Sequence, residues 1–261
     1  MRFDLSKVSY SKKDLKENVK IPKKLDKDLA YFLGIHYGDG TLGFYKRYYY
    51  YIGYSGHLND EYIFYTLYFK RLFKKLFNKN LRIFEDLREN KESIKLNTQS
   101  KAIFTFLNKV IGVKYGPKIN VKVPKVLKNS RYLSYFIRGI ADTDFSISFK
   151  NKDSYKHSYP VISFCTKDKL LVKELNILLK KFGFNTFVLY DYPKKRYKKV
   201  YISNLLQING KEQLQKWMDL IGFNSPKHLT KYEIWKKYGF CPPHTTLNER
   251  IKILKEGINN S

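Results

Sequence analysis

Apolar and polar positions alternate twice in a short stretch near the start of the chain. Within residues 41–45 and 49–55, apolar side chains occupy every second position, which predicts two short strands joined as a hairpin. Residues 59–77 carry apolar side chains at steps of three and four instead, as an amphipathic helix does. The same reasoning then predicts, in order, strands near 81–87 and 93–98 and a helix that begins at Lys101.

The second half of the 261-residue chain repeats these elements. One further helix precedes each hairpin, so the predicted order is αββαββα, twice, in an α+β fold with antiparallel sheets. A C-terminal extension, 228–261, is predicted to be helical on both sides of a break at Cys241-Pro242-Pro243. The elements predicted in the second half are strands near 145–150, 160–165, 186–190 and 199–204, and helices at 167–182 and 211–221.

Direct sequence similarity between the halves supports a tandem repeat. The segment SKAIFTFLNKVIG (100–112) aligns with GKEQLQKWMDLIG (210–222), and LGIHYGDG (33–40) aligns with RGIADTDF (138–145). A period of about 100 residues is that of whole domains and not of solenoid units. The predicted division is an N-terminal extension (1–20), a first half (21–122), a second half (123–227) and a C-terminal helical extension (228–261).

Composition adds a strong positive charge, +28 at pH 7, spread along the whole chain. A surface this basic attracts phosphate, so we expect a nucleic-acid partner; AT-rich codon usage is the alternative source of the lysines. Cys165 and Cys241 fit neither a zinc site nor a disulfide framework. No long apolar run or signal peptide is present, which predicts a soluble intracellular protein without membrane contact.

Helices on one face of each sheet would leave the other face open as a basic saddle that can follow the major groove. Arg47 is the favoured guanine contact, and the segment YPKKRYKK (192–199) is predicted to be a loop that grips phosphate through residues such as Lys195 and Arg196. The other candidate DNA contacts are Tyr45, Tyr49, Tyr51, Ser55, Lys95 and Asn97 in the first half and Ser146, Ser148, Lys150, Ser163 and Tyr201 in the second.

The segments LGIHYGDG and RGIADTDF, each after a Pro-Lys entry and before ββαββα, resemble the two motifs of a double-motif LAGLIDADG homing endonuclease. The resemblance covers residues 20–240. It implies a monomer with an internal pseudo-two-fold axis, with its motif helices packed at the domain interface. It also implies a sequence-specific endonuclease that cleaves both strands of a long asymmetric duplex DNA site, encoded in an intron or free-standing.

The last acids of the two motifs, Asp39 and Asp144, are the candidate catalytic and metal-binding residues. Each would end a helix, where the macrodipole disfavours a carboxylate. Small residues four apart, such as Gly34 and Gly38, would let the two helices approach, so that parallel packing brings the acids together. A hard cation between them, Mg²⁺ with Mn²⁺ able to substitute, would compensate both charges. The alternative for Asp39 alone is an Asp-Gly turn; for the second copy, Asp142 is a rival acid.

The resemblance also implies a basic residue near each scissile phosphate. Lys101 and Lys211 are the preferred symmetric candidates, Lys118 and Lys227 form a second matched pair, and the carbonyl groups of Gly38 and Thr143 are candidate metal contacts. His36 is interpreted as a packing residue. Two departures stand out: Phe145 replaces the glycine that closes the motif, which predicts a different turn, and Arg138 replaces Leu33. Either could make the sites unequal and leave a nicking enzyme.

Two other classes of function remain open. An RNA-binding intron maturase would use the same scaffold and charge, with or without nuclease activity, and intron RNA would then be a partner. A basic structural protein of ribosomal type would have no use for two matched acids, so it ranks last.

Overall fold

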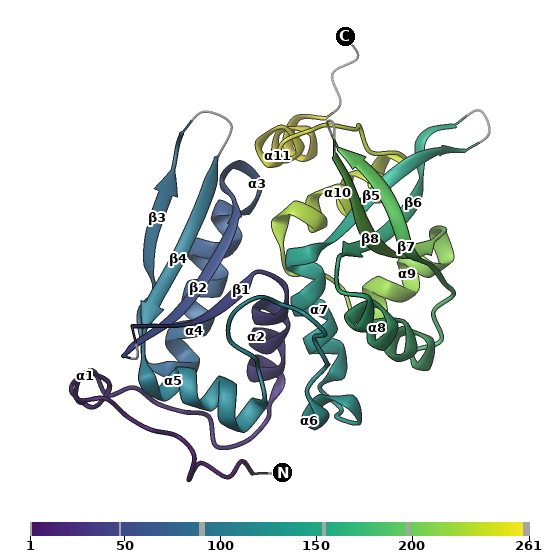
Figure 1. Cartoon of the computed structure of the whole chain (residues 1–261). Helices are drawn as coiled ribbons and strands as arrows, with labels where there is room; N and C mark the ends of the chain where they lie inside the picture. Colours follow the sequence, from purple (N-terminus) through teal and green to yellow (C-terminus); the bar gives the residue numbers. More distant parts are fainter. Residues whose placement is uncertain (1, 47, 89–91, 153–154, 197–198, 258–261) are drawn as a thin grey trace. The chain divides into compact units, whose positions relative to one another are not determined.

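The computed structural model describes residues 2–46, 48–88, 92–152, 155–196 and 199–257. The chain divides into two compact units. Unit 1 comprises residues 1–118 and 124–143, and unit 2 comprises residues 119–123 and 144–261. Each unit holds one four-stranded antiparallel sheet with helices packed against it (Figure 1). The predicted α+β fold with two repeated halves is confirmed.

The sheet of unit 1 has the strand order β1-β2-β4-β3. Strands β1 (Gly40–Tyr45) and β2 (Tyr49–His57) form the predicted hairpin, with Gly40 opposite Tyr54 and Tyr45 opposite Tyr49. Strand β4 (Ser93–Gln99) pairs with β2, and β3 (Arg82–Asp86) is the edge strand. All pairs are antiparallel, as the alternation of apolar and polar residues predicted.

The helix predicted over residues 59–77 is present but is not uniform. It comprises α3 (Leu58–Ile63), a π-helical segment η1 (Phe64–Phe69) and α4 (Lys70–Phe77), joined without a break. The helix beginning at Lys101 likewise has an α-helical part, α5 (Lys101–Thr105), and a π-helical part, η2 (Phe106–Ile111). The periodicity of apolar residues did not reveal this change of winding, which often marks a functional site.

Two helices of unit 1 carry the repeated motif. Helix α2 (Lys27–Gly38) begins at Asp26, whose side chain accepts a hydrogen bond from the Leu29 amide. After the short α6 (Lys125–Lys128), helix α7 (Leu133–Asp144) packs on α2, and the two run side by side in the same direction (Figure 1). A Cβ atom added to Gly34 would lie 2.8 Å from Cα of Gly139. Close backbone contact therefore requires glycine at both positions, as the sequence predicted.

Unit 2 repeats the sheet, in the order β5-β6-β8-β7. Helices α8 (Lys169–Lys181) and α9 (Lys211–Leu220) pack on it, and Trp217 lies fully buried against Phe145. The strands of this sheet are β5 (Phe145–Lys152), β6 (Tyr155–Thr166), β7 (Thr186–Arg196) and β8 (Lys199–Asn209).

Residues 192–196 correct one expectation. They were predicted to belong to a loop, but they continue β7, which pairs with β8 out to the Arg196–Lys199 pair beyond a bulge between Leu189 and Tyr192. Lysine and proline are depleted in strands, so pairing with β8, where Pro193 lies opposite Ile202 and Lys194 opposite Tyr201, holds this segment extended against its local preference. Residues 197 and 198 lie outside the described residues.

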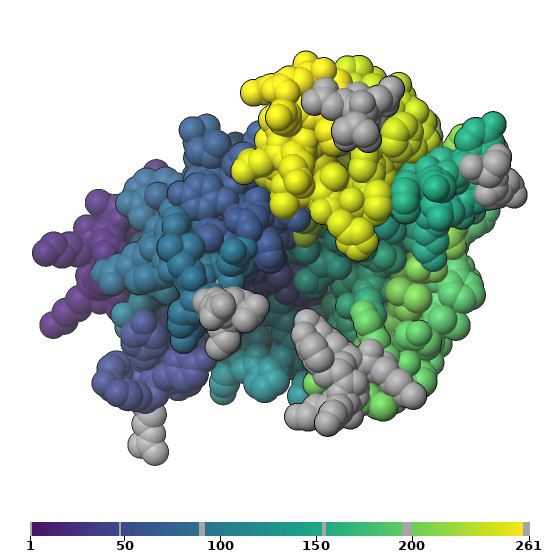
Figure 2. Space-filling model, turned by 90° about the horizontal axis from the view of Figure 1, so that it is seen from above, coloured from purple at the N-terminus to yellow at the C-terminus, as the bar shows by residue number. Residues whose placement is uncertain are grey.

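The C-terminal extension forms α10 (Pro226–Tyr238) and α11 (Leu247–Glu256), separated at the predicted Cys241-Pro242-Pro243 break. Helix α10 packs against β5, and yellow residues of this extension are visible at the surface in Figure 2. The fully buried Arg250 joins the two helices, since its Nε donates to the hydroxyl oxygen of Thr230 at 3.0 Å. No helix in the described part of the chain is long and apolar enough to cross a membrane.

Candidate functional site

Asp39 directly follows the last residue of α2. It is the C-cap residue, and its amide donates to the Ile35 carbonyl at 3.0 Å. Residues 32–38 are buried, and Asp39 is half-buried where strand β1 begins at Gly40. A carboxylate here adds negative charge to the negative end of the helix dipole, so other groups must offset it.

Tyr65 is one of these groups. Its phenol hydroxyl donates to Oδ2 of Asp39 at 2.5 Å, and the side chain is fully buried. Tyr65 lies in the π-helical segment η1, and its ring packs so closely against Gly56 that a Cβ atom there would overlap the ring and lie 2.6 Å from Oε2 of Glu61. The hydrogen bond fixes one carboxylate oxygen and turns the other away from the phenol.

Lys118 is the second group. Its Nζ donates to the carbonyl oxygen of Tyr37 at 3.0 Å and also to that of Gly38. These carbonyls belong to the last turn of α2, which has no intrahelical donors, so the ammonium group caps the helix and opposes its dipole. Lys118 therefore lies beside Asp39, and its charge also contributes to the environment of His36.

His36 packs beneath the same turn. It is buried, shares a 3.0 Å hydrogen bond with the Tyr54 hydroxyl, and has its pKa lowered to about 3 by burial and by the charge of Lys118. A Cβ atom on Gly40 would lie 2.5 Å from Nδ1 of His36. It would also lie 2.6 Å from the His36 Cα and against its carbonyl oxygen, so both the backbone and the ring of residue 36 favour the glycine that closes the first motif, although Gly40 is not in the left-handed region.

The second motif ends differently. Asp144 is the exposed last residue of α7, and Phe145 begins β5 at the position where Gly40 begins β1. Phe145 is buried and stacks on Phe164 with ring centroids 4.9 Å apart. The passage from helix to strand thus differs between the copies, since Asp39 is a turn residue between α2 and β1, whereas Asp144 still belongs to α7 and Phe145 follows it directly in β5.

Asp142, the rival acid, has a different environment. It is fully buried, and its Oδ2 accepts a 2.6 Å hydrogen bond from the Tyr31 hydroxyl of α2. The contact crosses the glycine seam between α2 and α7, so Asp142 holds the two helices together. Thr143 bonds back to the carbonyls of Gly139 and Ile140 through its own hydroxyl.

The preferred lysines lie at helix starts. Lys101 begins α5, its amide donates to Oδ2 of Asp14 at 3.1 Å, and its Nζ lies 5.8 Å from the centroid of Tyr50. Lys211 is exposed at the start of α9 and lines a cavity of unit 2. Lys118 contacts the carbonyls of the last turn of α2, whereas the contacts described for Lys101 are with Asp14 and Tyr50.

The candidate DNA contacts of the first half share the outer face of the sheet. Tyr45, Tyr49 and Tyr51 form a group of neighbouring rings, with those of Tyr49 and Tyr51 stacked at 6.3 Å. The rings lie over glycines, since a Cβ atom on Gly43 would lie 2.5 Å from the Tyr45 ring. Ser55 pairs with Lys95 and Gly53 with Asn97 on the same face. Arg47 lies outside the described residues.

In unit 2 the alternation also holds. Ser146, Ser148 and Lys150 are exposed on β5, while the residues between them are buried. Ser163 lies opposite Ser146 with a 2.8 Å contact between their hydroxyl oxygens. Tyr201 is exposed, and Nζ of Lys167 lies 5.2 Å from its ring centroid. Lys195 and Arg196 are in β7, but their side chains lie outside the described residues.

Sequence reasoning missed Tyr65, because the apolar pattern of residues 59–77 is that of an ordinary amphipathic helix and no motif marks the π-helical segment. The sequence did contain a signal for Lys118, the match of Gly116-Pro117-Lys118 to Ser225-Pro226-Lys227. This pair of lysines was ranked below Lys101 and Lys211. The described residues hold no cluster of three or more His, Cys, Asp or Glu side chains placed to bind a metal ion.

Comparison with known proteins supports the resemblance. Residues 131–222 match the family described as LAGLIDADG-like domain. No curated protein sequence matches the chain. Among solved structures, mesophilic variants of the homing endonuclease I-DmoI share 15% identity at a TM-score of 0.48, covering 75% of this chain and 95% of theirs.

Two further structures are similar at the same level. The homing endonuclease I-WcaI bound to its DNA recognition sequence shares 18% identity at a TM-score of 0.48, covering 89% of this chain and 94% of its own. The N-terminal LAGLIDADG domain of DUF199/WhiA shares 15% identity at a TM-score of 0.48, covering 84% of this chain and 93% of its own. I-DmoI has been solved in complex with DNA and Ca and in complex with DNA and Mn.

Proposed function

Because residues 131–222 form a LAGLIDADG-like domain and the first half repeats its order of elements, we propose that this protein is a site-specific endonuclease of double-stranded DNA. The observation that carries the proposal is the pair of acids that close α2 and α7, two helices held together through Gly34 and Gly139. A protein that only bound nucleic acid would gain nothing from acids at both helix ends. The net charge of +28 supplies the attraction to DNA.

The donors at the end of α2 fit a hard divalent cation. Asp39 contributes a carboxylate and Gly38 a backbone carbonyl oxygen, and both are hard oxygen ligands of the kind that such a cation prefers. Mg²⁺ uses few protein carboxylates and completes its coordination with water and substrate phosphate, which suits a site without a larger ligand cluster. When bound, such a cation would polarise the phosphodiester and offset its charge.

The chain's own groups would then act as follows. Tyr65 holds the Asp39 carboxylate in one orientation, and Asp144 supplies the equivalent carboxylate for the other strand. Lys118, held by the last carbonyls of α2, places an ammonium group where it can stabilise the charge that develops on the attacked phosphate. Lys227 is the matched candidate in the second half. We expect a monomer that cuts both strands of a long asymmetric site.

A cleavage screen tests the proposal directly. The protein is incubated with a randomised duplex library and Mg²⁺, and the cut ends are sequenced. We expect one long consensus cut on both strands, with Asp39→Asn and Asp144→Asn each removing the cut on one strand. Asp142→Asn, which keeps a hydrogen-bonding partner for Tyr31, should retain both cuts after its thermal unfolding has been matched to the wild type. Unchanged cleavage in both terminal-acid variants would contradict the proposal.

The exposed tyrosine group favours one second candidate, binding of structured RNA in the manner of an intron maturase. Flat aromatic rings on a basic sheet can stack unpaired bases. If no duplex in the library is cut while a structured intron RNA binds at physiological salt, this second function replaces the first.

A further inference from the structure

A cavity of about 360 Å³ lies at the edge of the sheet in unit 1. Its walls are the N-terminal extension, the end of α4, the start of β3 and the ends of β2 and β4. The repeat does not account for the extension, and the proposed cleavage chemistry does not use it. The extension nevertheless provides one wall of the cavity through α1 (Lys12–Lys16) and the residue after it, Glu17.

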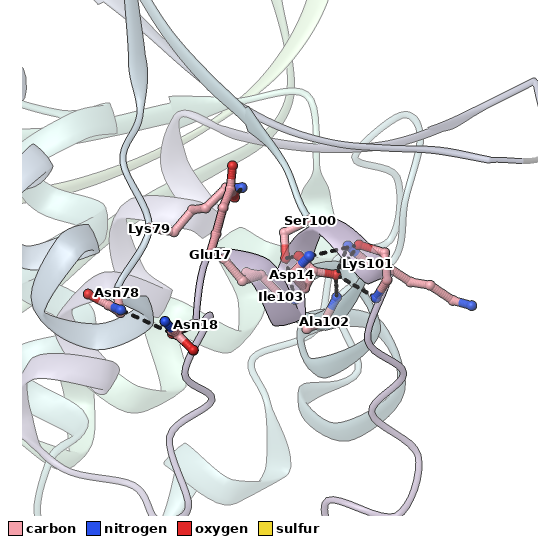
Figure 3. A network of polar contacts seen from close by, with 10 residues as sticks. Asp14, Glu17, Asn18, Asn78, Lys79, Ser100, Lys101, Ala102 and Ile103 are labelled. Atoms are coloured by element: carbon pink, nitrogen blue, oxygen red, sulfur yellow. Dashed lines mark hydrogen bonds and ion pairs between the residues drawn. The ribbon is translucent and has the colours of Figure 1, made fainter.

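Buried polar contacts hold this wall in place (Figure 3). Asp14 is 1% exposed; its carboxylate accepts from the Ser100 hydroxyl at 2.6 Å and from the Lys101 and Ala102 amides. These bonds fasten α1 to the first turn of α5. At the other end, Nδ2 of Asn78 donates to the Asn18 carbonyl at 3.0 Å. The extension is therefore a fixed part of unit 1, shown in purple at its exposed edge in Figure 2.

Most of the charged side chains that line the cavity are positive. Lys13, Lys74, Lys79 and Arg82 line it, and Glu17 is the single carboxylate among the lining residues. Glu17 is engaged by Lys79, whose side chain is 7% exposed. Burial, together with the charges of Lys13 and Arg82, lowers the pKa of Lys79. Cations gathered this closely repel one another and favour an anion between them.

The rest of the lining suits a nucleic-acid strand. Carboxamide side chains of Asn78, Asn80, Asn97 and Gln99 can donate hydrogen bonds to phosphate oxygens. Tyr49 lines the cavity and also belongs to the tyrosine group on the outer face of the sheet. The cavity therefore opens beside the face that we assign to DNA.

We propose that this cavity binds a phosphate group of a nucleic-acid strand lying on the outer face of sheet β1–β4, through Lys13, Lys74, Lys79 and Arg82. The identity of the strand rests on the proposed function; binding of phosphate itself does not. The N-terminal extension thus lengthens the DNA-contacting surface beyond the repeated fold.

A first experiment uses inorganic phosphate and the isotope-labelled full chain. Amide resonances of Asn80 and Gln99 are followed by NMR during a phosphate titration at low ionic strength. We expect a saturable shift that disappears in the double variant Lys13→Gln/Arg82→Gln. The matched control Lys12→Gln/Arg71→Gln removes equal charge from exposed residues of α1 and α4 that do not line the cavity, and it should keep the shift. Absence of a saturable shift in the wild type would overturn the inference.

A second experiment asks whether DNA supplies the phosphate. Binding of a fluorescent duplex is measured in the absence of divalent cations over a range of salt concentrations. A plot of the logarithm of the binding constant against the logarithm of the salt concentration has a negative slope, whose magnitude grows by about 0.9 for each phosphate contact. We expect this magnitude to be about 0.9 smaller in the cavity variant than in the matched control, because one phosphate contact is lost. Equal slopes in the two variants, together with phosphate binding by NMR, would overturn the assignment to a strand. If the wild type binds no duplex at all, the proposed function fails, while the phosphate titration still decides the cavity.

Discussion

The two motif helices end in matching acids but in different surroundings. At the end of α2, Asp39 is half-buried, bound by the Tyr65 phenol and neighboured by Lys118. At the end of α7, Asp144 is exposed and the next residue enters the core of unit 2. The comparison teaches that a repeated motif preserves the acid and the helix contact, while the packing around each acid is set by its own half.

The largest effect is expected from Lys118. Replacing it by Met removes the ammonium group at the end of α2, and loss of one such stabilising group costs a rate factor of about 10² to 10³. Cleavage of the strand served by Asp39 should fall by this amount in single-turnover assays. Lys101→Met is the matched control and should change the rate by less than about 2-fold. Equal losses of cleavage rate in both variants would indicate that Lys101 also acts at the cleavage site.

Tyr65→Phe should have the next largest effect. Without the phenol hydroxyl, Asp39 loses a partner that orients it, and changes of this kind lower metal affinity or activity by about 10- to 100-fold. The Mg²⁺ concentration for half-maximal cutting should rise for one strand and stay unchanged for the other. Tyr54→Phe removes a buried hydroxyl of the same size from His36 instead, and should leave both Mg²⁺ profiles unchanged.

The difference between Gly40 and Phe145 can be tested by exchange. Gly40→Ala places a methyl group against His36 and should lower the free energy of unfolding by about 1–3 kcal/mol, the usual cost of overpacking. Combined with His36→Ala, which removes the ring but leaves the backbone of residue 36 with its Cα 2.6 Å from the added atom, only the part of the cost due to the ring should disappear. Urea denaturation of all four members of the cycle gives the coupling energy. If the stability losses of the two single variants simply added up in the double variant, the imidazole ring of His36 would make no contribution to the cost of Gly40→Ala.

The smallest effect, taken over a single pH unit, concerns the pH dependence of stability. Burial keeps His36 neutral with a pKa of about 3, below the ordinary value of 6.5. The unfolded chain therefore binds a proton that the folded chain does not, so this contribution is complete above pH 6.5 and is lost as pH falls toward 3. The wild type should lose about 1 kcal/mol more stability than His36→Asn for each pH unit within that window. If the free energy of unfolding changed with pH in the same way for both proteins, His36 would not be a neutral buried histidine.

Much of the fold could be predicted because its signals are local. Alternation gave the β1–β2 hairpin, and the glycines at 34 and 139 gave the close helix pair. The long β7–β8 hairpin was underestimated because charged residues in a strand that extends beyond the core resemble a loop. The acids were found through the repeat, but Tyr65 was not, because its contact with Asp39 depends on a π-helical turn that no apolar pattern records.

The division of the chain into units has a consequence for how the protein could be taken apart. The chain passes from unit 1 to unit 2 at residue 119, returns at residue 124 and leaves again after residue 143. A ribosome must therefore synthesise α7, well into the second repeat, before unit 1 has all its parts. A gene cut at the boundary between the repeats would separate α2 from α7 and expose the Gly34–Gly139 seam to water. Shuffling of halves would have to exchange this helix together with the half that it completes.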